Sequence, residues 1–415
     1  MHEQSLACGE PAHLARCGNA AALALALQAS RCDTLSTFAV FESALPGLAV
    51  PQRAEFNPPL WELGHIGWFQ SWWLGRYPAC GEGVQADPDQ PRLAPQRAGA
   101  DALYDSSRVP HATRWQLALP GADATRADLH SQLQQTLALL AAWPAAAEPS
   151  LYFFRLALLH EDMHHEAALY MAQALGLNIA DARWQTPTLP APPAALALPG
   201  GPFELGSASD AGFAFDNELG ARSVRTAPFE IDAQVLRWAE FLPFIEAGGY
   251  TDARWWTSAG VDWRRASGAL VPRYLRKAAG SAHAWQLWRH GAWQALPLDE
   301  PACHLTQHEA LAWCSWAGRR LPTEIEWEHA ALSEHGSAGS FRWGDVWEWT
   351  ASPFAPYPGF RAHPYRDYSA PWFDGRPVLR GASFMTQPRL RHARFRNYFP
   401  ATRNDVPAGL RSCAV

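Results

Sequence analysis

The sequence contains no stretch of about 20 apolar residues, the length needed to cross a lipid bilayer. Its first residues also lack the basic segment followed by an apolar stretch that is typical of a signal peptide. It also lacks a long run of basic residues, and its formal net charge is −6. We therefore expect neither a membrane nor a nucleic-acid partner, because phosphate binding needs a concentrated basic surface. The seven cysteines form no Cys-x-x-Cys pair. Reduced thiols and a cytoplasmic protein are expected.

The chain of 415 residues is too long for one ordinary hydrophobic core, so it predicts two domains. We expect a helical domain over residues 18–182, a proline-rich linker over 183–200 and an α+β domain over 201–415. There are 21 tryptophans. Core packing is the favoured explanation for them, and an aromatic pocket for a quaternary ammonium group is the alternative.

Helical periodicity dominates the first 180 residues. Apolar side chains recur every three or four positions over residues 20–44, 60–74, 124–142 and 150–175. These four helices predict an up-and-down bundle, in which inward side chains of facing helices can form a metal site. Residues 78–104 are polar and rich in proline and glycine, which predicts a loop. After the linker only residues 236–246 and 307–317 stand out as helical, among short β-prone runs.

The sharpest local motif is His-Glu-Asp-Met-His at residues 160–164, inside an apolar helix. His160 and His164 are four residues apart, so both imidazoles project from one helix face and can bind one metal ion. Neutral imidazole suits zinc, iron, copper and nickel. The motif also matches the His-Glu-x-x-His signature of zinc hydrolases, with Glu161 as the base. No His-x-x-Gly-x-x-His extension follows, and the spacing alone leaves both readings open.

A third imidazole is available from another predicted helix. His65 shares a helix face with Trp61 and Trp68, where a lone histidine is more commonly a hydrogen-bonded core residue. Opposite a histidine pair it becomes a candidate ligand. Three neutral imidazoles on one side of an octahedral ion leave up to three positions for substrate and O₂. Glu166 is then expected to orient an imidazole.

The motifs as a group resemble those of the ergothioneine-type (EgtB-like) sulfoxide synthases, non-haem iron enzymes. That family joins a DinB-like four-helix bundle to a formylglycine-generating-enzyme-like, C-type-lectin-related α+β domain. The resemblance extends over nearly the whole chain. It rests on Leu-Gly-His at 63–65, His-x-x-x-His-x-Glu at 160–166, and the segments 317–328, 346–350, 378–383 and 395–398.

The resemblance implies an Fe(II) cofactor and small-molecule substrates, namely hercynine, O₂ and a chalcogen donor. The family joins a thiol sulfur to the imidazole carbon between the two ring nitrogens of hercynine and also oxidises the sulfur. Carried over residue by residue, it implies iron ligation by His65, His160 and His164, proton donation by Tyr365 with Tyr368 as the alternative, and hercynine contacts by Asn397 and Tyr398.

Departures from the family pattern concern the donor pocket. Where γ-glutamylcysteine is the donor, the family carries an Arg-x-x-Arg pair and a nearby acid. Here the corresponding positions hold His111, Arg114 and Phe399, and Met163 replaces a glutamine. Segments 57–65, 104–108 and 160–164 are most similar to the selenoneine synthases, which implies a selenosugar donor and C–Se bond formation. A sulfoxide synthase that uses cysteine or γ-glutamylcysteine is the alternative.

Overall fold

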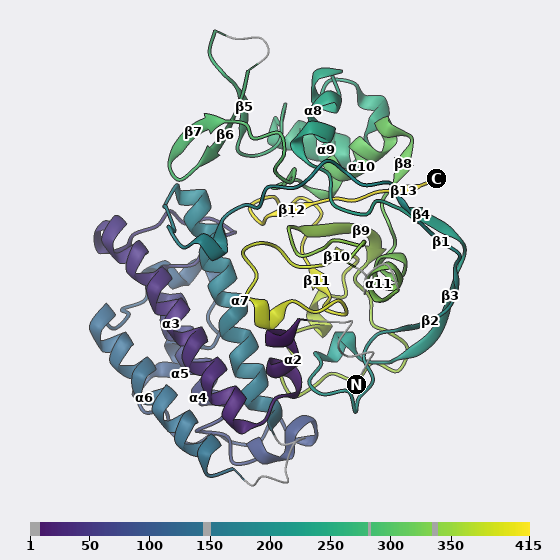
Figure 1. The fold of residues 1–415 in the computed structure, drawn as a ribbon. Coiled ribbons are helices and arrows are strands. Elements are labelled where there is room, and N and C mark those ends of the chain that lie inside the picture. The colour runs from purple at the N-terminus through teal and green to yellow at the C-terminus, as the bar shows by residue number, and fades with distance from the viewer. Residues whose placement is uncertain (1–8, 144–150, 281–283, 334–338) are drawn as a thin grey trace.

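The computed structural model describes residues 9–143, 151–280, 284–333 and 339–415. The N-terminal part is helical, and the C-terminal part combines short strands with further helices (Figure 1), which confirms the expected α+β class. The first half contains α2 (Glu10–Cys17), α3 (Ala20–Ala44), α4 (Pro59–Trp73), α5 (Ala100–Tyr104), α6 (Ala122–Ala141) and α7 (Tyr152–Leu175). Within the described ranges, no helix is both long and apolar enough to cross a membrane.

The helices α3, α4, α6 and α7 form a bundle in which α3 packs on α7 and α4 on α6. Local signals set their ends. Asn19 caps α3 by accepting from the Ala22 amide at 3.0 Å, and α7 ends at Gly176, whose φ of 73° suits glycine. The four predicted helices match within a few residues, although position 150 lies outside the described part of the chain. The predicted 78–104 loop contains α5.

The second half is built from short strands in four sheets. The central sheet has the order β11-β10-β9-β12, and the others are β1-β4-β13-β8, β2-β3 and β5-β6-β7. The strands are β1 (Leu196–Leu198), β2 (Gly201–Leu205), β3 (Arg222–Thr226), β4 (Phe229–Ile231), β5 (Leu275–Lys277), β6 (Trp285–Arg289), β7 (Ala292–Ala295), β8 (Arg319–Arg320), β9 (Trp347–Pro353), β10 (Pro377–Arg380), β11 (Asn397–Tyr398), β12 (Ala408–Gly409) and β13 (Cys413–Ala414).

The second half contains more helices than the sequence predicts. Besides α8 (Trp238–Glu246) and α10 (Gln307–Ala317), the structure has α9 (Ser258–Ser267) and α11 (Glu324–Leu332). A threonine-glutamate capping box starts α11, so a local signal existed. The range expected to be a proline-rich linker, 183–200, contains β1, which pairs with β4.

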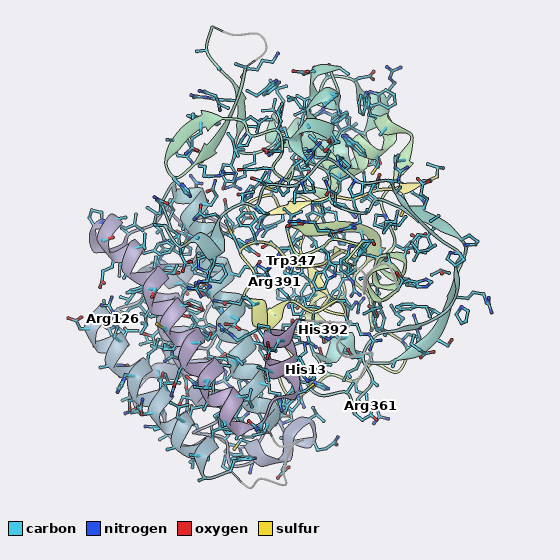
Figure 2. The ribbon with its side chains drawn as sticks, in the orientation of Figure 1. His13, Arg126, Trp347, Arg361, Arg391 and His392 are labelled. Atoms are coloured by element: carbon cyan, nitrogen blue, oxygen red, sulfur yellow. The ribbon has the colours of Figure 1, made fainter. Side chains whose placement is uncertain are left out.

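The two halves meet along α7, where Glu166 is a buried hydrogen-bonding centre. One oxygen of its carboxylate, Oε1, accepts from Trp347 Nε1 at 2.8 Å, Ser383 Oγ at 2.9 Å and Thr386 Oγ1 at 2.7 Å. The Tyr170 hydroxyl donates to the same oxygen. Figure 2 shows Trp347 near the middle of the molecule. Glu166 therefore joins the bundle to the central sheet.

A neighbouring polar contact involves His165, which is 1% exposed. Its Nε2 lies 2.9 Å from Thr37 Oγ1 on α3, and its Nδ1 lies 3.1 Å from Gln387 Nε2 in the second half. Burial lowers the pKa of His165 to about 4, and the negative charge of Asp33, which would raise it, has the smaller effect. The ring is therefore neutral in the folded protein at neutral pH.

This shift predicts an acid-sensitive interface. Between pH 6.5 and pH 4 the unfolded chain binds a proton at His165 that the folded chain does not, so stability is present at higher pH and lost as pH falls. From pH 7 to pH 5, the free energy of unfolding of the wild type should fall by about 2 kcal/mol more than that of His165→Gln. Urea unfolding at both pH values measures this, and parallel pH dependences would contradict it.

Candidate metal centre and its cavity

Three histidines converge between α4 and α7. The ligand atoms of His65, His160 and His164 all lie within 4.8 Å of one another, and the Nε2 atoms of His160 and His164 are 3.2 Å apart. Metal–imidazole bonds of about 2.1 Å at right angles would place two nitrogens about 3.0 Å apart. The i, i+4 spacing on α7 and the facing position on α4 together produce a geometry that fits one metal ion.

The orientation of His65 depends on the chain around it. Its Nδ1 donates to the Tyr104 carbonyl at 2.8 Å, which leaves Nε2 with its lone pair. The ring is stacked near Trp61, at a centroid distance of 4.8 Å, and Trp68, at 5.8 Å. A Cβ at Gly64 would lie 2.3 Å from the Tyr104 ring. Glycine thus allows the close approach that brings the Tyr104 carbonyl to the imidazole.

His164 contacts a carboxylate that sequence reasoning did not select. Its Nδ1 contacts Glu62 Oε2. Glu62 lies three residues before His65 on α4, so both side chains share a helix face. The expectation that Glu166 orients an imidazole is wrong, because its hydrogen bonds go to Tyr170, Trp347, Ser383 and Thr386. The i, i+3 spacing of Glu62 and His65 was the signal that could have found Glu62.

Burial keeps two of the candidate metal ligands, His65 and His160, in the neutral form that ligation requires. It lowers the pKa of His65 to about 3 and that of His160 well below its usual range, with the charge of His164 adding to both shifts. Burial would raise the pKa of Glu62, but His164 and Asn57 hold it at about 2. His65 and His160 are therefore neutral at neutral pH, the form in which imidazole binds a divalent transition metal.

A cavity of about 690 Å³ opens beside the histidines. His160 and His164 form part of its wall, whereas His65 is buried and is not among the lining residues. The other candidates from the sequence all line the same cavity: His111, Arg114, Met163, Glu166, Tyr365, Tyr368, Asn397, Tyr398 and Phe399. The cavity is thus bounded by α7, by α4 and the segments before and after it, and by the second half.

The two candidate tyrosines occupy different positions. The Tyr365 ring lies 6.2 Å from the His160 ring and 4.9 Å from Phe69 by centroid distance, and its hydroxyl has no hydrogen-bond partner in the described ranges. The Tyr368 ring stacks on Phe215 at 4.3 Å, and its hydroxyl lies 3.8 Å from the Met163 sulfur. Burial raises the pKa of both phenols, so both remain protonated at neutral pH.

The remaining wall of the cavity is held rigidly. The Tyr398 hydroxyl donates to the Tyr368 carbonyl, and its ring stacks on Phe354 at 4.0 Å. The Asn397 side-chain oxygen accepts from the Tyr398 amide at 2.9 Å. His111 Nε2 donates to the Phe56 carbonyl at 2.7 Å. These contacts fix the ring planes that face the cavity.

Two guanidinium groups reach the cavity, and both are already engaged. Arg114 Nη1 donates to Asn57 Oδ1 at 2.8 Å, and the guanidinium lies 3.8 Å from the centre of the Trp61 ring. Arg403, which the sequence analysis did not select, pairs with Asp405 through two contacts, one of them 2.8 Å long. Arg403 therefore presents a neutralised charge to a ligand.

Glu161 does not face the metal centre. Its carboxylate oxygens accept from Arg31 Nε at 2.8 Å and from Arg31 Nη2 at 3.1 Å, and the side chain is 2% exposed. Arg31 lies on α3, which contributes no residue to the cavity wall. The Glu161 carboxylate is therefore one partner of a buried structural ion pair. It is not placed to act as the base of a zinc hydrolase.

The Glu161→Gln variant tests this assignment. Removing one charge of a buried pair leaves Arg31 uncompensated, and we expect the free energy of unfolding to fall by about 3 kcal/mol. Metal content and the activity of the folded enzyme should match the wild type. Urea unfolding and metal analysis measure both effects, and a variant that keeps its stability but loses its activity would restore Glu161 as a catalytic base.

Comparison with known proteins adds independent evidence. Residues 182–345 match the sulfatase-modifying factor enzyme 1-like domain. The chain is 33% identical to the hercynine oxygenase of Mycolicibacterium smegmatis and 32% identical to that of Mycobacterium tuberculosis, covering 86% of this chain and 90% of each relative. The formylglycine-generating enzyme of Streptomyces coelicolor is 36% identical over 160 residues, 36% of this chain and 49% of that protein. Since the first two matches span both halves, the chain belongs to the hercynine oxygenase (EgtB-like) family.

Proposed function

We propose that this protein is an Fe(II)- and O₂-dependent enzyme that joins the chalcogen of a small donor to the hercynine imidazole. The observation that supports it most is the meeting of three imidazoles, His65, His160 and His164, beside a cavity lined by aromatic residues of the second half. Relatives that match over 86% of this chain are named hercynine oxygenases. The donor we propose is a selenosugar, and a thiol is the alternative.

The reaction balances as a four-electron oxidation. The ring C–H bond of hercynine and the Se–H or S–H bond of the donor break, and the C–Se or C–S bond forms. One atom of O₂ remains on the chalcogen and the other leaves as water. His65, His160 and His164 would hold the iron, which would supply O₂ activation, and the cavity beside them would keep the reactants close together. Tyr365, protonated and facing the cavity, holds the proton that the reduction of O₂ requires.

Hercynine carries a trimethylammonium group, which aromatic faces attract. Tyr398 and Phe399 line the cavity next to Asn397, and the stacking of Tyr398 on Phe354 keeps its ring in place. The side-chain nitrogen of Asn397, Nδ2, has no hydrogen-bond partner within the described residues. It can therefore donate to the carboxylate of hercynine. These features support hercynine binding against the wall made by the second half.

The cavity chemistry favours a neutral donor over an anionic dipeptide. Arg403 is neutralised by Asp405, and Arg114 is held by Asn57. Hydroxyl, carboxylate and aromatic groups that suit a polyol gather at another part of the wall. Ser107 Oγ donates to Asp367 Oδ2 at 2.6 Å, and the indole nitrogen of Trp372 donates to the Asp367 carbonyl at 2.9 Å. Trp372 is 40% exposed, so its ring can pack on a sugar.

The test is anaerobic reconstitution with Fe(II), followed by O₂ in the presence of hercynine and one donor at a time. The donors are a selenosugar, cysteine and γ-glutamylcysteine. We expect the selenosugar to give the highest kcat/KM and a product mass that contains selenium and hercynine. Preferential use of a thiol would overturn the proposed donor. The absence of O₂ uptake and of product with all three donors would overturn the proposed function.

A further inference from the structure

A row of polar side chains lies behind His164, on the side of the ring away from the other two histidines. We propose that Glu62 positions His164 for metal binding and that Asn57 and Arg114 hold Glu62 in place. The inference rests on the proposed function only in that the three imidazoles hold Fe(II). It identifies three positioning residues that do not themselves bind the metal.

The contacts of Glu62 account for both of its oxygens. Oε2 contacts Nδ1 of His164, and Oε1 accepts from Nδ2 of Asn57. Asn57 Oδ1 in turn accepts from Arg114 Nη1 at 2.8 Å. Because a carboxylate can only accept, His164 must donate from Nδ1. The tautomer is therefore fixed with its lone pair on Nε2, the atom 3.2 Å from His160 Nε2.

The three imidazoles differ in this respect. His65 donates its Nδ1 proton to the backbone carbonyl of Tyr104, and His160 Nδ1 is buried without a partner among the described residues. Among the three imidazoles, His164 is thus the one whose Nδ1 contacts a carboxylate within the described residues. A carboxylate makes the imidazole more basic as well as orienting it, and such partners are worth about 10–100-fold in metal affinity.

The local sequence explains why the row forms. Pro58 and Pro59 precede Glu62, and Pro59 occupies the first turn of α4, where the missing amide is not needed. The prolines restrict the backbone next to Asn57. At the far end, the Arg114 guanidinium stacks on Trp61 at 3.8 Å from the ring centre. Each member of the row is held by a neighbour other than the metal ligand.

A structural role alone would have a different signature. If Glu62 only tied α4 to α7, its removal would lower the stability of the metal-free protein and leave Fe(II) affinity unchanged. A positioning role predicts a loss of Fe(II) affinity that exceeds any loss of stability, because the tautomer and basicity of His164 matter only when the metal binds. Asn57, Glu62 and Arg114 also line the cavity, and Arg114 is separated from His164 by three hydrogen bonds.

The experiment measures Fe(II) affinity of the full-length metal-free protein by anaerobic competition with a chromogenic chelator. The variants are Glu62→Gln, Glu62→Ala and Asn57→Ala. The control is Glu42→Gln, which removes the same charge from a surface pair with Arg126, 2.9 Å long, at the outer edge of the bundle (Figure 2). Urea unfolding of each metal-free variant provides the stability readout.

We expect Glu62→Ala to weaken Fe(II) binding by about 10–100-fold. Glu62→Gln should lose less Fe(II) affinity, because its side-chain amide oxygen can still accept from Nδ1 of His164. Asn57→Ala should lose less again, and the control variant should keep the wild-type affinity. Wild-type affinity in both Glu62 variants would overturn the inference, as would a stability loss without an affinity loss. Failure of the wild type itself to bind Fe(II) would instead overturn the proposed function, and the inference with it.

Discussion

Replacing His160 with alanine is expected to remove bound iron and to lower turnover by about 1,000-fold or more. His160 provides one of the three imidazoles that lie within 4.8 Å of one another, and no described side chain nearby can replace its nitrogen. A metal ion stabilises the transition state by several kcal/mol, and the loss of that stabilisation corresponds to a rate loss of this size. Metal analysis after anaerobic reconstitution and O₂ uptake with hercynine and a donor measure the two effects.

The matched control is His130→Ala. His130 is exposed on α6, in the same bundle, so its removal should change neither iron content nor rate. If His160→Ala retained stoichiometric iron and full activity while His130→Ala did the same, the metal assignment would be wrong.

Replacing Tyr365 with phenylalanine is expected to lower kcat by about 100- to 10,000-fold, the range over which a positioned proton donor contributes. The ring contacts with Phe69 and Trp73 do not involve the hydroxyl, so the fold and Fe(II) affinity should be retained. Burial raises the pKa of Tyr365, which keeps the phenol protonated through the neutral range. Single-turnover kinetics on the iron-loaded variant measure the effect on the chemical step.

Tyr368→Phe distinguishes the two candidate tyrosines. Its hydroxyl contacts the Met163 sulfur at 3.8 Å, a weak interaction, and its ring stacks on Phe215 in either case. We therefore expect only a small change in kcat. A large loss in Tyr368→Phe together with near-normal turnover in Tyr365→Phe would reverse the assignment.

The sequence was most informative where one long helix buries one continuous face. The predicted 20–44 and 307–317 helices have the bounds of α3 and α10, because apolar periodicity over 11 residues or more is a strong signal. The short strands of the second half, several of them two or three residues long, carry no such signal. Their pairing depends on contacts between distant segments, as when β13 at the C-terminus pairs with β4 and β8.

The same distinction applies to the site. The i, i+4 spacing of His160 and His164 is a local property, and it predicted their shared helix face. Glu166 could not be interpreted locally, since its partners Trp347, Ser383 and Thr386 are more than 180 residues away in sequence. Glu62 and Asn57 were inside a recognised motif, but their role appears only when α4 and α7 face each other.

The central claim is that His65, His160 and His164 hold iron at a cavity shared by the two halves. Anomalous diffraction at the iron absorption edge, from crystals grown anaerobically with Fe(II), tests it most directly. We predict a single strong peak about 2.1 Å from one nitrogen of each imidazole. A peak at another position, or coordination that omits His65, would contradict the account.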